Sequence, residues 1–151
     1  MNPFDLKSAL LAKHAQHVVL IHFPIALFLA GTGFDLLARW SKQSVNRATM
    51  MAAARINIFA AAVFVVPTIV IGILAWQLQL EGEKLKGLLL LHLVLACVAG
   101  TMICLVAFLQ WRQQKKPGMA VSNYCLVLEF FTAIVIALAA HVGGFLSGVN
   151  G

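Results

Sequence analysis

The chain contains few charged residues. Asp, Glu, Lys and Arg make up 11% of its 151 residues, whereas about a quarter is usual for a soluble domain. Hydrophobic residues make up 62% of the chain, and the mean hydropathy is +0.93. A soluble core of this size could not bury so much apolar surface. The composition therefore excludes a soluble globular domain and indicates an integral membrane protein.

Sequence motifs for several common chemistries are missing as well. The chain has no nucleophile triad, phosphate-binding loop or carboxylate pair, so we do not expect a stand-alone enzyme such as a hydrolase or a kinase. The three cysteines, Cys97, Cys104 and Cys125, have neither zinc spacing nor the Cys-x-x-Cys-His pattern of covalent haem. We expect all three to be small buried thiols.

Four long apolar runs dominate the sequence. They extend approximately over Val18 to Trp40, Ile56 to Leu80, Leu88 to Trp111 and Ser122 to Leu146. Each exceeds the roughly 20 residues that cross a hydrocarbon core as a helix, and none alternates as the strands of a membrane barrel do. The predicted fold is an all-α integral membrane four-helix bundle, a single domain over 1–151 that begins with a short amphipathic surface segment over 1–16.

The basic residues predict the topology of the bundle. The net charge is +6, but the cations are not interleaved with aromatic residues, so we do not expect nucleic acid as a partner. They flank the first and third connections: Arg39, Lys42, Arg47 and Arg55, then Arg112, Lys115 and Lys116. Cytoplasmic connections carry such an excess. Both termini are therefore expected on the opposite, periplasmic side of an inner membrane.

Three histidines lie within the apolar runs. His22, His92 and His141 are each about five residues from the outer boundary of a predicted span, or roughly 7 Å below it. His17 lies about one turn nearer the surface. Small residues recur at four-residue intervals from each of the three histidines, which is typical of helix faces that pack closely or surround a ligand. We therefore expect the three imidazoles to meet in one layer inside the bundle.

Several kinds of chemistry would use such a layer. Imidazoles on facing helices are the usual axial ligands of non-covalent haem b, with His22 and either His92 or His141 as the pair. Three neutral imidazoles could instead bind copper or zinc. They could also bind a quinol headgroup and accept its protons, with His17 as a gate to the surface. The alternative is structural, because membrane helices also use histidines for hydrogen bonds across a bundle.

Two acidic residues lie within the spans. Glu129 is expected about a third of the way in from the cytoplasmic side, either as a proton-relay carboxylate or as a partner of Asn57 or Thr68. Asp35 and Arg39 are four residues apart on one predicted helix. We expect them to pair as a structural clasp.

A family resemblance rests on the opening of the first span. The segment His17-Val-Val-Leu-Ile-His22-Phe23-Pro24, followed by Phe34-Asp35, resembles the start of a bacterial four-helix membrane family of unknown function. Gly72, His92 and Gly143-Gly144 are similar to later landmarks of that family. The resemblance covers the whole chain. It implies the four-helix fold and a bacterial inner membrane, and it implies no particular activity.

The leading hypothesis is a small membrane subunit of a respiratory or photosynthetic electron-transfer assembly. It would bind haem b or a quinol through the histidines near the outer face, and its partners would be lipid and other membrane subunits of a redox complex. The alternative is a non-catalytic accessory or assembly subunit with no cofactor. A metal-binding protein or small-solute carrier is a weaker third hypothesis, because we find no internal repeat or charged pore residue.

Overall fold

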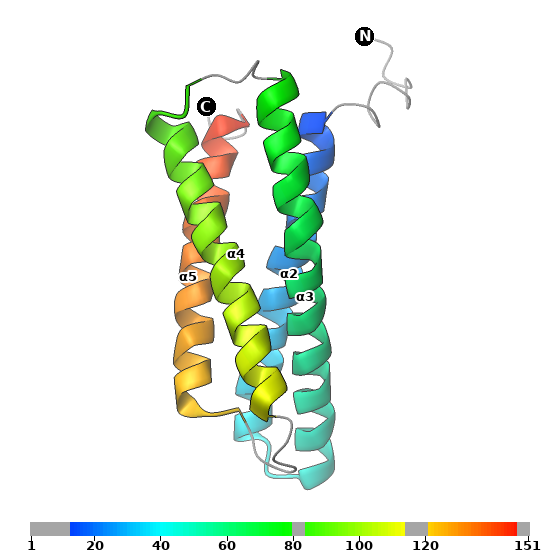
Figure 1. Cartoon of the computed structure of the whole chain (residues 1–151). Helices are drawn as coiled ribbons and strands as arrows, with labels where there is room; N and C mark the ends of the chain where they lie inside the picture. Colours follow the sequence, from blue (N-terminus) through cyan, green and yellow to red (C-terminus); the bar gives the residue numbers. More distant parts are fainter. Residues whose placement is uncertain (1–12, 80–83, 114–120, 148–151) are drawn as a thin grey trace.

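In a computed structural model, which describes residues 13–79, 84–113 and 121–147, the protein consists of four long helices. The elements are α2 (Lys13–Trp40), α3 (Ser44–Gln79), α4 (Gly87–Gln113) and α5 (Asn123–Leu146), as Figure 1 shows. No strand occurs in these three described stretches. Each helix is long and apolar enough to cross a membrane, which confirms the predicted fold class. The surface segment predicted over 1–16 lies outside the described residues up to residue 12.

Helix α3 is longer than the apolar run that predicts it. It has 36 residues and is therefore about 54 Å long, whereas a hydrocarbon core is about 30 Å thick. The predicted span begins near Ile56, but the helix begins at Ser44. Arg47 and Arg55 thus lie on the helix itself and not in the connection, because backbone hydrogen bonding continues beyond the apolar stretch.

The helices pair as two antiparallel hairpins (Figure 1). Helix α2 packs against α3 along its length, and α4 packs against α5. Helix α3 also contacts α4, and α2 contacts α5, so that α2 and α4 lie diagonally across the bundle. The α2–α3 approach depends on Gly31: a Cβ there would lie 2.5 Å from Ile58 Cγ1 and 3.1 Å from the Ala54 carbonyl oxygen.

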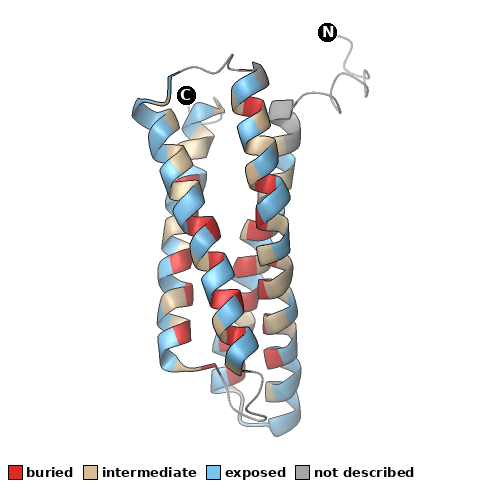
Figure 2. Cartoon of the chain, viewed as in Figure 1, coloured by how far each residue is buried: buried red, intermediate tan, exposed pale blue. Residues whose placement is uncertain are grey.

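The two ends of the bundle differ in packing. We call the end at which α2 and α4 begin the histidine end, and the end at which α3 and α5 begin the carboxylate end. The hairpins converge toward the carboxylate end and separate toward the histidine end (Figure 1). Buried residues accordingly follow the inward faces and are concentrated away from the histidine end (Figure 2). The core includes Phe28, Ile58, Val106, Cys125 and Ile136.

The outward faces are apolar on all four helices. Val19, Val63, Leu105 and Phe130 are among many large apolar side chains exposed on the outside of the bundle. In water such a surface would be a large association site, whereas in a bilayer it contacts acyl chains. Because the helices are apolar on every side, sequence periodicity does not identify their inward faces.

Polar contacts connect α2 to the start of α5 at the carboxylate end. Arg39 donates one hydrogen bond to the Val121 carbonyl oxygen at 2.9 Å and another to Asn123 Oδ1. Asp35 accepts a hydrogen bond from Gln110 on α4. The predicted Asp35–Arg39 clasp is therefore wrong: each residue bonds to another helix instead.

Candidate functional site

A half-open cavity of about 140 Å³ lies between the two hairpins toward the histidine end. All four helices contribute to its wall, which is mainly apolar. Its residues include Ile21, Val65, Ile69, Trp76, Leu93 and Ile136. Small residues widen it, and among them are Gly72, Ala96, Gly100 and Ala140. The cavity is therefore shaped for an apolar ligand.

Two imidazoles are among the few polar side chains in the cavity wall, which also include Thr68, Cys97 and the indole of Trp76. His17 comes from α2 and His92 from α4, and both are half-buried. Because α2 and α4 are diagonal in the bundle, the two rings reach the cavity from opposite sides. Thr68 also lines the cavity, but its hydroxyl donates to the Phe64 carbonyl oxygen at 2.7 Å. The two histidines are thus the principal groups that could orient a ligand.

Each cavity histidine packs against a glycine of the other helix in its hairpin. A Cβ on Gly72 of α3 would lie 2.8 Å from His17 Cε1, and a Cβ on Gly143 of α5 would lie 2.9 Å from His92 Cε1. Real Cβ atoms almost never come so close to another heavy atom. The two glycines therefore make the space in which the rings lie.

His92 is held by a hydrogen bond between helices. Its Nδ1 lies 3.1 Å from the Ala139 carbonyl oxygen of α5. A carbonyl oxygen only accepts, so Nδ1 is the donor in this bond. Position 143 lies one helical turn after Ala139, and a glycine there leaves the Ala139 carbonyl accessible to the ring. Gly143 therefore leaves room for the ring, and the Ala139 carbonyl fixes the tautomer of His92.

The α2–α3 and α4–α5 hairpins share the same spacing between the cavity histidine and a second polar residue on the first helix. His17 and Asp35 are 18 residues apart on α2, and His92 and Gln110 are 18 residues apart on α4. Eighteen residues make five helical turns, so the members of each pair lie on the same helix face. This repeat is hard to recognise in the sequence because the matched residues, Asp35 and Gln110, differ in type. The equal spacing, together with the partner glycines on α3 and α5, is the signal that could have revealed it.

His22 and His141 do not join the cavity. Both side chains are exposed on the outside of the bundle. His22 Nδ1 lies 2.6 Å from the Val18 carbonyl oxygen of its own helix, and His141 stacks edge-on against Phe145 with ring centroids 4.9 Å apart.

The expected layer of His22, His92 and His141 therefore does not assemble, and the interior pair is His17 with His92. Five residues separate His17 from His22, or about 140° around a helix, so only one of the two can face the interior. In the described parts of the chain, no three His, Cys, Asp or Glu side chains come together as a metal site. The predicted three-histidine copper or zinc site is thus not formed there.

A polar cluster, separate from the cavity, lies in the core near the carboxylate end. Gln110 Nε2 of α4 donates to Asp35 Oδ2 of α2 at 2.6 Å and to Glu129 Oε1 of α5 at 3.0 Å. Cys125 Sγ lies 3.5 Å from the same Glu129 oxygen. Asp35, Gln110 and Glu129 are 3%, 1% and 0% exposed, so one amide joins two carboxyl groups and three helices in the buried core.

The cluster differs from the prediction for Glu129. Its partners are Gln110 and Cys125, whereas Asn57 and Thr68 bond within α3 to the carbonyl oxygens of Ala53 and Phe64. The pairing of two carboxyl groups was not predicted, because Asp35 and Glu129 are 94 residues apart in the sequence. The amide oxygen of Gln110 and the second carboxyl oxygen of Glu129 are buried without a hydrogen-bond partner.

The cysteines occupy different environments. Cys125 is buried in the polar cluster, as expected, but Cys97 and Cys104 are exposed. Cys97 also borders the cavity. The prediction of three buried thiols is therefore correct only for Cys125. The other two lie on sides of α4 that the neighbouring helices do not cover.

One of three comparisons with known proteins finds a match for the chain. No curated protein and no solved structure matches the chain. A family model described as "Predicted membrane protein (DUF2231)" matches residues 13–151, which include all four helices, the cavity and the polar cluster. The resemblance noted from the opening motif is thus confirmed at the level of a membrane family of unknown function. The chain belongs to the DUF2231 family of predicted membrane proteins.

Proposed function

We propose that the protein binds the ring of a quinol or quinone lipid in the cavity at the histidine end, as a small subunit of a membrane electron-transfer assembly. The observation that supports this proposal is an apolar cavity with two imidazoles on diagonally opposed helices, His17 and His92. The ring would lie between the two hairpins. Its apolar tail would leave the cavity toward the acyl chains.

The size of the cavity favours a single ring. An enclosed apolar cavity of roughly 150 Å³ holds one benzene ring, and the cavity measures about 140 Å³. A porphyrin joins four pyrrole rings around a metal and needs several times that space. The cavity therefore favours a quinone headgroup over haem b unless the hairpins separate further.

The placement of the polar groups favours a ring with two oxygen atoms on opposite sides. Quinones and quinols have this geometry. His17 and His92 approach from helices that are diagonal in the bundle, so each could meet one oxygen. A pocket with few polar groups and a mainly apolar wall is typical of sites for lipophilic cofactors.

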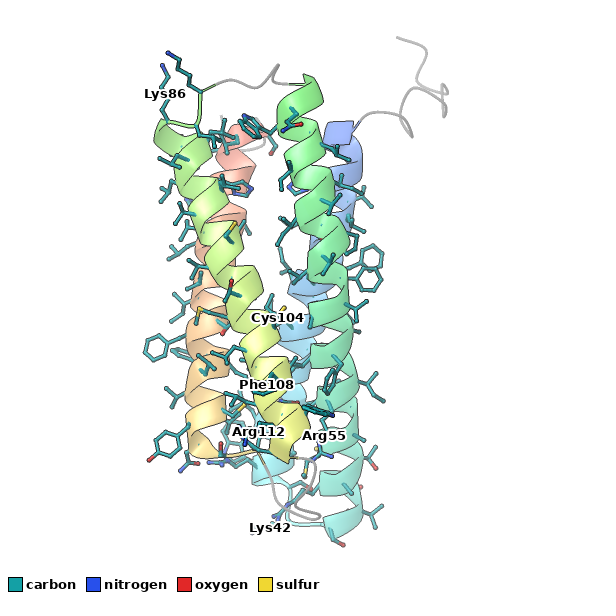
Figure 3. The ribbon with its side chains drawn as sticks, in the orientation of Figure 1. Lys42, Arg55, Lys86, Cys104, Phe108 and Arg112 are labelled. Atoms are coloured by element: carbon teal, nitrogen blue, oxygen red, sulfur yellow. The ribbon has the colours of Figure 1, made fainter. Side chains whose placement is uncertain are left out.

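The charges favour one orientation in the membrane. Lys42, Arg55 and Arg112 lie near the carboxylate end, and Lys86 lies at the histidine end (Figure 3). The cationic excess at the carboxylate end is typical of the cytoplasmic side. In a bacterial inner membrane the cavity would then lie near the periplasmic surface, at the end where α2 begins and α5 ends. Another membrane protein would exchange electrons with the bound ligand.

Ligand binding is testable on the purified full-length protein in detergent. Trp76 lines the cavity, so its fluorescence should be quenched saturably by decylubiquinol under anaerobic conditions. His92→Ala should weaken this binding about tenfold or more, which corresponds to about 1.4 kcal/mol. His141→Ala is the matched control: it removes an imidazole on the outside of the bundle and should leave affinity unchanged.

Other outcomes would decide between the remaining functions. Absence of saturable quenching, or equal affinity in the His92→Ala and His141→Ala proteins, would overturn the quinone proposal. A Soret band that appears on adding haem and is lost in His92→Ala would support a haem protein instead. If neither ligand binds, a non-catalytic accessory subunit becomes the better hypothesis.

A further inference from the structure

We propose that the cavity selects the reduced, hydroxyl-bearing form of its ring ligand over the oxidised form, because His92 presents a hydrogen-bond acceptor to it. This inference rests on the proposed function, since it assumes that a quinol or quinone ring occupies the cavity. It adds the redox state of the preferred ligand and the atom that recognises it.

The tautomer of His92 follows from its partner on α5. The Ala139 carbonyl oxygen has lone pairs and no hydrogen, so the 3.1 Å contact with His92 Nδ1 requires the hydrogen on Nδ1. A neutral imidazole has only one N–H group. In the neutral ring Nε2 therefore carries no hydrogen. It would act as the acceptor for a ligand in the cavity that His92 lines.

The protein keeps the ring in this arrangement. A Cβ built on Gly143 would lie 2.9, 3.3 and 3.7 Å from Cε1, Nδ1 and Nε2 of His92. The imidazole thus lies directly against the backbone of α5. Turning the ring to bring Nε2 to α5 would break the bond to the carbonyl oxygen of Ala139, a buried residue. The packing of α4 on α5 therefore keeps Nδ1 as the donor and Nε2 as the acceptor.

The two redox forms of the ligand differ in what they offer to that acceptor. A quinol has two O–H groups, and either can donate to Nε2. A quinone has only carbonyl oxygens, so oxygen and nitrogen lone pairs would face each other in an apolar pocket. Sites that recognise a hydroxyl by hydrogen bonding reject analogues that lack it, because the polar group of the protein is left unpaired.

The test compares three ligands on the full-length protein in detergent under anaerobic conditions. They are decylubiquinol, decylubiquinone and the dimethyl ether of decylubiquinol, which keeps the aromatic ring but has no O–H. Isothermal titration calorimetry should show decylubiquinol binding at least about tenfold more tightly than the other two. The comparison of decylubiquinol with its dimethyl ether uses the unmodified protein. It therefore remains valid even if a substitution prevents folding.

A pair of variants identifies the responsible residue. His92→Gln should reduce the preference to less than about threefold, since an amide side chain can both donate and accept. His141→Gln, outside the cavity, should keep the full preference.

The outcomes separate this inference from the proposed function. Binding of the quinone or the ether as tight as that of the quinol would overturn the inference and leave quinone binding established. Retention of the full preference in a folded His92→Gln protein would overturn the role of His92. Absence of binding by all three ligands would refute the proposed function itself.

Discussion

His92 of α4 packs against the bare backbone of Gly143 of α5, so closely that a Cβ at position 143 would lie 2.9 Å from the imidazole. The same relationship joins His17 and Gly72 in the other hairpin, at 2.8 Å. In each hairpin the histidine near the start of the first helix lies against a glycine near the end of the second. The cavity lies between these two histidine–glycine pairs.

Gly143→Ala should weaken ligand binding without removing any polar group. The added methyl must displace the His92 ring, because its neighbour is the backbone-anchored imidazole and not a flexible chain end. Loss of the Ala139 bond is worth about 1 kcal/mol, so we expect affinity for decylubiquinol to fall about fivefold. Calorimetry measures this change. Gly33→Ala, whose Cβ would meet nothing within 4 Å, should bind as the unmodified protein does; equal affinity in both variants would contradict the role of Gly143.

Gly31→Ala should destabilise the α2–α3 hairpin. Its Cβ would lie 2.5 Å from Ile58 Cγ1 and 3.1 Å from the Ala54 carbonyl oxygen, and the backbone cannot yield as a side chain can. Overpacking of this kind costs about 1–3 kcal/mol. Unfolding in mixed detergent micelles measures the loss. Gly33→Ala serves again for comparison and should leave stability unchanged or raise it by up to about 1 kcal/mol, because alanine favours helix.

Gln110→Leu should be the most damaging single substitution at the carboxylate end. It removes the amide that donates to both Asp35 and Glu129, so two buried carboxyl groups lose their shared donor. We expect the free energy of unfolding to fall by about 3 kcal/mol or more. In an Asp35→Asn, Glu129→Gln background the same change should cost less than half as much. An undiminished cost in that background would show that Gln110 acts through packing alone.

The orientation of the bundle can be measured with single cysteines. In a protein whose three native cysteines are replaced by alanine, Lys86→Cys and Lys42→Cys would place one thiol at each end of the bundle. A membrane-impermeant maleimide added to intact spheroplasts should label Lys86→Cys directly. Lys42→Cys should react only after permeabilisation. The reverse pattern would place the cavity on the cytoplasmic side.

His22→Ala and His141→Ala, alone or together, should leave decylubiquinol binding unchanged. Both imidazoles are exposed on the outside of the bundle, away from the cavity. Calorimetry and the fluorescence of Trp76 should agree on this point. A loss of affinity in the double variant, with the thermal melting of the helices unchanged, would show that the outward histidines take part in the site.

The length of the apolar runs determined the architecture without help from tertiary structure. Four runs of more than 20 residues, separated by polar segments, permit only four spanning helices. The run near Ile56 predicted one helix start poorly, because Ser44 to Arg55, which carries Arg47 and Arg55, is a helical extension of α3 and not a loop. Hydropathy detects the part of a helix that lies in lipid. It does not detect the part that continues beyond it.

The sequence does not show which face of each helix is turned inward. The packing of the helices against one another decides it. In a bilayer, leucine and valine suit lipid as well as they suit a core, so these helices carry no apolar stripe that marks the interior. His22 and His141 therefore looked equivalent to His92 in the sequence, and packing turned them outward. Likewise, Asp35, Gln110 and Glu129 meet only because α2, α4 and α5 converge at one end. The apolar runs alone specify four spans, whereas helix packing selects which of their polar residues share an interior.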